Sequence, residues 1–232
     1  MKMNREWISI SDMMSGLMMV FLFIAVVFMQ KIHQDKEAMV DIANTYIETK
    51  SKLNEALHIE FDKDLAAWGA EILNDNTIRF KEPEVLFNKS EAILKDKFKI
   101  ILDDFFPRYV RVLTSEIFVK DIIELRVEGH TSSEWRTNST IEVTYLENAH
   151  LSQNRAFSVV SYLFSLPTVS QHQDWLIKVF RANGLAFAKK IMVNGEEDVD
   201  KSRRVEFRAI TNTEKRIEDI LDRSKNSLST TK

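Results

Sequence analysis

The longest apolar run in the chain covers residues 8–30, close to the N-terminus. Residues 13–29 contain no charged side chain, and as an α-helix they extend over about 26 Å, slightly less than the hydrocarbon core of a bilayer. Residues typical of membrane interfaces flank the run: Lys2, Arg5, Trp7, Lys31 and Lys36. The pattern predicts that residues 1–30 form a short N-terminal segment and one transmembrane helix.

One carboxylate, Asp12, lies at the start of this run. An ionisable group at membrane depth costs free energy and usually faces a protein partner or an ion path. Ser15, Gly16 and Met19 follow at spacings that place all four residues on one helical face. We therefore predict that this face is a helix interface within a membrane bundle. Composition alone leaves two alternatives open, a cleavable signal peptide and a plain single-helix anchor.

Residues 31–76 are strongly charged, yet their apolar residues recur at the spacing of an amphipathic helix. The apolar positions are Met39, Ile42, Tyr46, Leu53, Leu57, Phe61, Leu65, Trp68 and Ile72. The heptad is irregular, so a solvated helical linker and a short coiled coil both agree with it. The apolar stripe could also be covered by docking on the following domain or by lying against the membrane. Each interpretation makes this segment a helical linker that leads to a folded domain.

Predicted strands and helices alternate along residues 77–213. Alternation of apolar and polar residues predicts strands at residues 77–80, 122–128 and 203–210, with a weaker signal at 189–193. Helical spacing predicts helices at residues 88–108 and 148–165 and in part of 171–187, with a polar loop at 132–147. These elements predict an α+β domain in which helices cover a sheet, followed by a polar tail at residues 214–232.

The strand at residues 203–210 has the clearest alternation in the chain. Val205, Phe207 and Ala209 alternate with three charged residues, Arg204, Glu206 and Arg208. We therefore predict a half-buried strand.

Composition excludes several classes of function. The net charge of −3, without an extended basic face, argues against a nucleic-acid partner. The chain has no cysteine, which excludes disulfides and thiolate metal sites. No phosphate loop, dinucleotide fingerprint, zinc-protease motif or nucleophile elbow is present, so no catalytic site is predicted. His130 and His150 are too isolated in sequence to indicate a metal, and the acidic residues 196–200 indicate a solvated turn.

Three separated motifs carry a resemblance: Gly129-His130-Thr131, then Asn148-x-x-Leu151-Ser152-x-x-Arg155-Ala156, then Arg203-Arg204-Val205. In this order they resemble the OmpA-like peptidoglycan-binding domain. The resemblance implies a mixed sheet with helices on one face. It also implies that Arg155 grips the free carboxylate of the diaminopimelate in the peptide stem, for which a guanidinium fork is suited.

The resemblance further implies that five other residues lie in or near the same groove: Thr131, Ser132, Asn148, Leu151 and Ser152. The chain departs from the family pattern at Ser132, where the family has an aspartate, and at Ser202, where it has an asparagine. Without that aspartate, the ligand's ammonium needs another counter-charge, for which Glu134 and Glu147 are candidates.

A membrane helix with one aspartate, a linker and an OmpA-like domain is the layout of MotB, the B subunit of flagellar stators. The residues around Asp12, and the segment from Gly129 to Trp135, look closer to the MotB-like B subunits of Zorya anti-phage systems. That resemblance implies a homodimer inside a pentamer of MotA-like A subunits, in which ion flow past the paired aspartates drives rotation.

The same resemblance implies a single-pass protein of the bacterial inner membrane, with a cytoplasmic N-terminus and a periplasmic C-terminal domain. Asp12 would carry H⁺ or Na⁺, and no cofactor is expected. Two alternatives remain open on the sequence: a flagellar stator subunit, and a passive envelope tether of the OmpA or Pal type.

Overall fold

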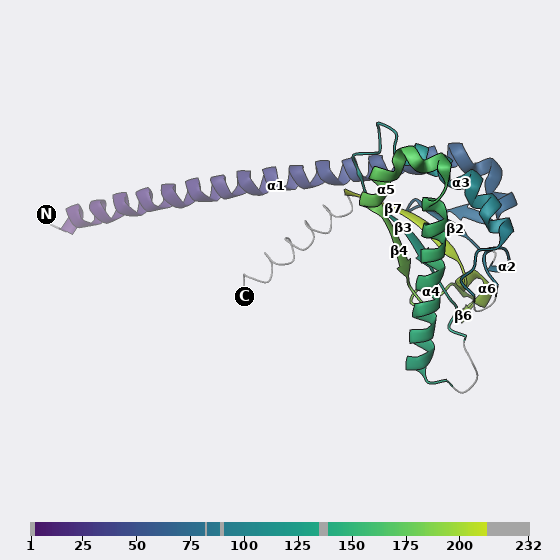
Figure 1. Cartoon of the computed structure of the whole chain (residues 1–232). Helices are drawn as coiled ribbons and strands as arrows, with labels where there is room; N and C mark the ends of the chain where they lie inside the picture. Colours follow the sequence, from purple (N-terminus) through teal and green to yellow (C-terminus); the bar gives the residue numbers. More distant parts are fainter. Residues whose placement is uncertain (1–2, 82, 89–90, 135–138, 213–232) are drawn as a thin grey trace. The chain divides into compact units, whose positions relative to one another are not determined.

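The computed structural model describes residues 3–81, 83–88, 91–134 and 139–212 (Figure 1). The described residues divide into two compact units, residues 3–46 and residues 47–212. The predicted polar tail, residues 214–232, lies outside the described residues.

The first unit contains the N-terminal part of helix α1 (Met3–Trp68). Its segment Ser11–Gln34 has a mean hydropathy of 2.2 and is long and apolar enough to cross a membrane, since an α-helix of this length extends over about 36 Å. All side chains of this segment are exposed in the isolated chain. Its apolar surface therefore fits a surrounding of lipid or of other protein chains.

The second unit begins within the same helix. Leu53, Leu57, Phe61 and Trp68 of α1 are buried in the hydrophobic core of this unit. The predicted bounds of the linker, residues 31–76, are therefore wrong for the last turns of the helix. Their apolar stripe docks on the domain, which is one of the alternatives that the sequence left open. The predicted domain boundary at residue 77 is also too late, since residues 70–72 belong to the sheet.

The second unit is built on a five-stranded mixed sheet with strand order β1-β2-β7-β3-β4. Its strands are β1 (Ala70–Ile72), β2 (Thr77–Phe80), β7 (Val205–Thr211), β3 (Ile122–Gly129) and β4 (Phe180–Gly184). All neighbours pair antiparallel except β3 and β4, which are parallel. The predicted strands at 77–80, 122–128 and 203–210 are confirmed.

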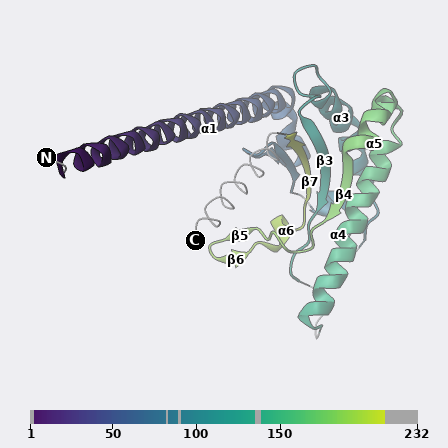
Figure 2. The same ribbon diagram turned by 90° about the vertical axis from the view of Figure 1, so that its left-hand side faces the viewer.

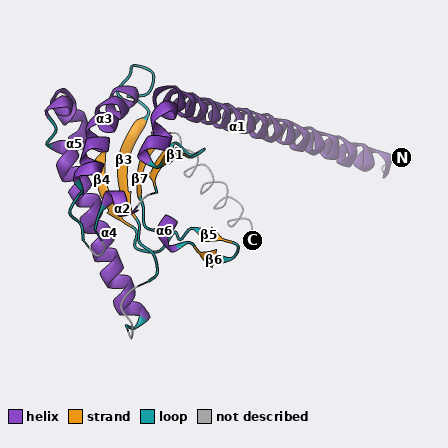
Figure 3. Cartoon of the chain, turned by 90° about the vertical axis from the view of Figure 1, so that its right-hand side faces the viewer, coloured by secondary structure: helices purple, strands orange, loops and turns teal. Residues whose placement is uncertain are grey.

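Helices pack on one face of this sheet, as Figures 2 and 3 show. They are α3 (Asp96–Leu113), α4 (Ile141–Phe164) and α5 (Gln173–Val179), with the short η1 (Pro167–His172) before α5. Shorter elements complete the unit: α2 (Pro83–Leu86), a hairpin of β5 (Met192–Val193) and β6 (Glu196–Glu197), and α6 (Val199–Ser202). The predicted fold class, a membrane-type helix followed by an α+β domain with a mixed sheet and helices on one face, is confirmed.

Aromatic rings fill the core between the sheet and the helices. Phe105 of α3 lies 5.0 Å from Phe207 of β7 and 5.3 Å from both Phe80 of β2 and Phe61 of α1, measured between ring centroids. Such pairs add to the free energy gained by burying the rings. One ring cluster thus joins α1, α3 and the centre of the sheet.

Three predicted elements differ from the structure. The helix predicted at 88–108 begins later and ends later, as α3. The helix predicted at 148–165 begins earlier, at Ile141, because the hydroxyl of Thr140 caps it by accepting a hydrogen bond from the backbone N–H of Val143. The second half of the partly helical segment 171–187 contains strand β4, which periodicity did not reveal.

Candidate functional site

Two glycines bring helix α4 close to the sheet. Gly129 and Gly184 are paired neighbours at the ends of the parallel strands β3 and β4. A Cβ atom on Gly129 would lie 2.3 Å from the backbone oxygen of Ser152, and one on Gly184 would lie 2.3 Å from the backbone nitrogen of Gln153. Only glycine allows this approach, which places the α4 motif beside the loop after Gly129.

Ser152 holds this arrangement together. Its side chain is fully buried, and its hydroxyl donates to the carbonyl of Ala149 and accepts from the N–H of Ala186, both at 3.0 Å. The backbone N–H of Thr131 donates to the carbonyl of the same Ala186 at 2.9 Å. The structure therefore gives Ser152 a hydrogen-bonding role between α4 and the segment after β4, and its place in the ligand groove stays a prediction.

The other predicted groove residues lie close in the fold but differ in exposure. Asn148 is buried and donates to the carbonyl of Thr144 at 3.0 Å, within its own helix. Leu151 is half-buried, whereas Thr131 and Ser132 are buried. The hydroxyl of Thr131 has no hydrogen-bond partner among the residues that the structure describes, so it is a polar atom open to a ligand or a water.

Arg155 is the most distinctive residue of the α4 motif. It is only 7% exposed, and its guanidinium donates through Nε to the carbonyl of Glu91 at 2.8 Å and through Nη2 to the carbonyl of Asn88 at 3.2 Å. The guanidinium carbon lies 5.0 Å from the centre of the Phe87 ring, in cation–π geometry. Neutral partners thus fix the plane of the guanidinium and leave its charge uncompensated.

The electrostatic surroundings of Arg155 favour an anion. Burial, together with the nearby Arg203, lowers the pKa of Arg155 to about 10, so the side chain remains a cation at neutral pH. Among the described residues, no carboxylate forms an ion pair with Arg155. A ligand carboxylate would supply the missing negative charge, and a guanidinium can bind it through two hydrogen bonds.

Ser132 occupies the position of the family aspartate, and the role of the two predicted substitutes stays a prediction. Glu134 and Glu147 are both exposed, and neither has an ion-pair partner within the described ranges. The carboxylate that reaches this loop is Glu197 of β6, which accepts hydrogen bonds from the backbone N–H of Ser133, at 2.9 Å, and from its hydroxyl. Sequence reasoning missed Glu197 because it treated the acidic segment as solvated.

Ser202, the second departure from the family pattern, is fully buried just before β7. Its hydroxyl accepts a hydrogen bond from the backbone N–H of Ile191 at 3.0 Å, and its carbonyl accepts one from Nη1 of Arg204 at 3.1 Å. Ser202 therefore preserves a polar link between the β7 motif and the β5–β6 hairpin.

Charged residues form a continuous row across four strands of the sheet. Glu71 of β1 is paired with Arg79 of β2, Arg79 with Glu206 of β7, and Glu206 with Glu128 of β3. Nε of Arg79 lies 2.7 Å from Oε1 of Glu206, and Nη1 of Arg79 lies 3.2 Å from Oε1 of Glu71. The row ends at the two carboxylates of Glu206 and Glu128, which face each other.

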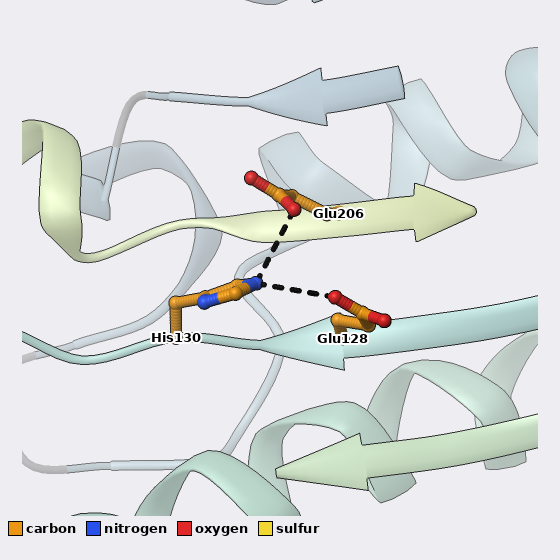
Figure 4. A group of neighbouring side chains, drawn as sticks. All are labelled: Glu128, His130 and Glu206. Atoms are coloured by element: carbon orange, nitrogen blue, oxygen red, sulfur yellow. Dashed lines mark ion pairs between the residues drawn. The ribbon is translucent and has the colours of Figure 1, made fainter. Parts of the chain in front are cut away.

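His130 lies at this end of the row (Figure 4), and Arg204 lies there as well, beside Glu206. Nε2 of His130 lies 3.4 Å from Oε2 of Glu206 and 3.7 Å from Oε2 of Glu128. Nε of Arg204 donates to Oε1 of Glu206 at 2.6 Å. All four residues are at least 95% buried. The motif residues His130 and Arg204 are thus part of one buried charge cluster.

The carboxylates of this cluster are ionised at neutral pH. Burial alone would raise the pKa of Glu206, but His130 and Arg204 outweigh burial and hold that pKa far below its usual range. Burial also acts to raise the pKa of Glu128, and His130 and Lys189 lower it overall.

Sequence reasoning missed this cluster because an alternating strand is expected to expose its polar face. Glu206 and Arg204 lie on the polar face of the 203–210 strand, yet both are buried. One signal could have found the cluster: Glu128 adjoins the Gly129 motif and Glu206 adjoins the Arg204 motif. One motif ends β3 and the other begins the antiparallel neighbour β7, so their adjacent charged residues come together.

The residues predicted in the membrane segment lie on α1. Asp12, Ser15, Gly16 and Met19 are all exposed in the isolated chain. The hydroxyl of Ser15 donates to the carbonyl of Ser11 at 2.9 Å, which satisfies it within the helix. A Cβ atom on Gly16 would meet nothing within 4 Å. This face is therefore open to a neighbouring helix.

Comparison with known proteins identifies relatives in sequence, although no family model matches the chain. The Zorya protein ZorB of Escherichia coli strain ATCC 8739 is 42% identical over 220 residues, which cover 94% of this chain and 93% of that protein. A Zorya protein ZorB of Escherichia coli O139:H28 is 27% identical, over 87% of this chain and 78% of that protein.

Among solved structures, a MotB-like protein from Desulfovibrio vulgaris is 15% identical, with a TM-score of 0.48 over 75% of this chain and 99% of that one. The cell wall anchor of the T6SS from Pseudomonas aeruginosa is 21% identical, with a TM-score of 0.46 over 67% of this chain and 97% of that one. The family assignment rests on the first sequence relative, which matches nearly the whole length of both proteins. The chain therefore belongs to the ZorB family of Zorya proteins.

Proposed function

We propose that this protein is the B subunit of an ion-driven rotary motor of the bacterial inner membrane, anchored to peptidoglycan and acting in anti-phage defence. The observation that carries the proposal is Asp12, the only acidic residue of the apolar helical segment Ser11–Gln34, in a chain of the ZorB family. In this proposal the N-terminus is cytoplasmic and the domain is periplasmic.

The chemistry of Asp12 suits ion transfer. A carboxylate at membrane depth is neutralised when it binds H⁺ or Na⁺, which removes the cost of placing its charge there. One elementary charge that crosses the membrane releases about 2.3 kcal/mol per 100 mV. Repeated loading and release at Asp12 would therefore supply free energy for stepwise rotation. The chain needs no cofactor and no catalytic site for this work.

The assembly in this proposal is a homodimer inside a pentamer of MotA-like A subunits. The open face of α1 around Asp12 supports it, because Ser15 and Gly16 are small enough for close helix packing. Met19 extends the same face by one turn and adds a flexible apolar contact. This face would place Asp12 between the B-subunit helix and an A subunit.

The periplasmic domain would act as the fixed mount, held by peptidoglycan at Arg155. Support comes from the guanidinium itself, which is buried, fixed in plane by two carbonyls and without a carboxylate partner in the described part of the chain. A free carboxylate of a wall peptide has the shape and charge that complete this site.

The motor is tested by phage protection in cells that carry the complete system. Asp12→Asn keeps the size of the side chain but cannot bind and release an ion, so we expect protection to be lost while the protein still co-purifies with the A subunit. The exposed Asp174→Asn, in α5, is the matched control and should protect fully. Full protection by Asp12→Asn, with normal assembly, would support a passive tether instead.

Wall binding is tested separately, by sedimentation of the detergent-solubilised protein with purified peptidoglycan. Arg155→Lys keeps the charge but loses the bidentate fork, so we expect at least about tenfold weaker binding, a loss of roughly 1.4 kcal/mol. Arg181→Lys, on the exposed edge strand β4, is the control. Equal sedimentation of both variants and the parent would contradict the assignment of Arg155.

A further inference from the structure

The cluster of Glu128, His130 and Glu206 is not used by the proposed motor or by the wall site. Glu128 lies in β3, His130 follows the end of β3, and Glu206 lies in the neighbouring strand β7. The three side chains converge on one point, as Figure 4 shows. Their ligand-type atoms, two carboxylate oxygens and one imidazole nitrogen, all lie within 4.8 Å of one another. The exposed fractions are 2%, 1% and 5%, so solvent hardly reaches the group.

Two of these atoms are buried and lack a hydrogen bond. Within the described residues, Oε2 of Glu128 accepts no hydrogen bond, and Nε2 of His130 neither donates nor accepts one. Their polar contacts there are ion pairs of 3.4–3.8 Å with each other, with Glu206 and with Lys189. Buried polar atoms without a hydrogen bond cost free energy, so a ligand bound between them would be favoured.

The two separations from His130 match a metal site better than a direct hydrogen bond. A charge-assisted N–H···O hydrogen bond is about 2.7–2.9 Å long, whereas Nε2 lies 3.4 Å and 3.7 Å from the two carboxylate oxygens. Ligands bound to Zn²⁺ at about 2.0–2.2 Å in a tetrahedron are roughly 3.4 Å apart. The two separations from His130 are therefore close to the edges of such a tetrahedron.

We propose that Glu128, His130 and Glu206 bind one divalent transition-metal ion of the Zn²⁺ class. Each residue supplies one ligand, and a water completes the tetrahedron. Arg79 and Arg204 hold the other oxygen of Glu206, as outer residues commonly orient a ligating carboxylate. Ca²⁺ is disfavoured because it takes six to eight oxygen ligands, which this site does not offer.

Such an ion would cross-link β3 and β7 where the loop toward Ser132 begins. It would also neutralise the two opposed carboxylates, Glu128 and Glu206. One cation competes for the same place: Nζ of Lys189 lies 3.8 Å from Oε2 of Glu128, but its side chain is 54% exposed and can turn into solvent. The site therefore predicts that removing the charge of Lys189 strengthens metal binding.

The test is calorimetric titration of the full-length, detergent-solubilised protein with ZnCl₂ after removal of metals with a chelator. We expect one equivalent of Zn²⁺ per chain and no comparable binding of CaCl₂. Glu128→Gln should weaken Zn²⁺ binding at least tenfold, and His130→Ala should abolish it. His150→Ala, which removes an exposed histidine of α4, is the matched control and should bind as the parent does.

Lys189→Met keeps the proposal testable if the buried variants fail to fold, because it changes an exposed side chain. We expect this variant to bind Zn²⁺ several-fold more tightly than the parent, and Zn²⁺ to raise the thermal unfolding temperature of both proteins. The proposal is overturned if the parent binds no Zn²⁺. It is equally overturned if Zn²⁺ binding is lost in His150→Ala but not in Glu128→Gln, or if Lys189→Met leaves the affinity unchanged.

Discussion

Glu128 and Glu206 are directly opposed on the antiparallel strands β3 and β7, so the sheet holds two buried carboxylates side by side. Like charges in this position destabilise a sheet unless cations compensate them. Arg204 and Arg79 supply that compensation through bonds of 2.6 Å and 2.7 Å to Oε1 of Glu206. The motif that begins at Arg203 therefore has a structural reason for its second arginine.

The first prediction concerns this compensation. Arg204→Met leaves Glu206 buried with fewer counter-charges, and we expect the free energy of unfolding to fall by about 3 kcal/mol. Denaturant unfolding of the solubilised protein, monitored by tryptophan fluorescence, measures this loss of unfolding free energy. Arg208→Met, on the same strand and outside the cluster, serves as the control and should cost much less. Equal losses in the two variants would contradict the role given to Arg204.

The second prediction concerns the close approach of α4 to the sheet. Gly129→Ala places a methyl group 2.3 Å from the backbone oxygen of Ser152, which cannot move as a side chain tip could. We expect a loss of about 3 kcal/mol in unfolding free energy, since the helix must shift. Gly184→Ala should behave alike, because its Cβ would meet the backbone at Gln153. If both variants unfold at the same temperature as the parent, helix α4 does not approach the sheet as closely as described.

The third prediction tests where the domain begins. Phe61→Ala removes a fully buried ring from the core, and we expect it to reduce the free energy of unfolding by about 3–5 kcal/mol. Ile59→Ala is the matched control two residues away, and its side chain is 77% exposed, so its effect should stay within about 0.5 kcal/mol. If both variants lose similarly little unfolding free energy, this segment of α1 is a linker and not part of the domain core.

The same segment shows where prediction from sequence stops. The apolar stripe that contains Leu57 and Phe61 was visible, and so was its helical period, but periodicity does not tell which surface covers the stripe. The strands were predictable because their alternation is local, as in β7. The burial of Glu206 was not, because it depends on Arg79 and His130, which come from other strands.

The neighbourhood of the α4 motif was predictable but its hydrogen bonds were not, and wall binding there stays a prediction. Three motifs indicated that α4 lies near the Thr131 loop, and the two glycines show how Ser152 and Gln153 approach the ends of β3 and β4. The engaged hydroxyl of Ser152 was not predictable, because its partner at Ala186 lies in a segment without a clear pattern. Side-chain hydrogen bonds between distant segments follow from the packed structure.

The fourth prediction concerns alkaline pH. The hydroxyl of Tyr162 donates to Oδ1 of Asp103 at 2.6 Å, and burial together with Asp103 raises the pKa of Tyr162 to about 12. The stabilisation from this bond is therefore complete below the unfolded-state pKa of about 10 and is lost as the pH rises toward about 12.

Tyr162→Phe should lower the unfolding free energy by about 1 kcal/mol at neutral pH, with a difference that shrinks above about pH 10. Unfolding curves of parent and variant across this range measure it, with Tyr145→Phe as an exposed control. A difference that grows with pH would contradict the assignment.

Ion flux through the membrane segment tests the central claim most directly. Cells that produce this protein together with its A subunit are loaded with fluorescent reporters of cytoplasmic pH and Na⁺, and influx is compared between the parent and Asp12→Asn at equal amounts of assembled complex. We expect H⁺ or Na⁺ to enter with the parent and the influx to be abolished by Asp12→Asn. Equal influx through both proteins would contradict the assignment of Asp12 as the residue that carries the ion.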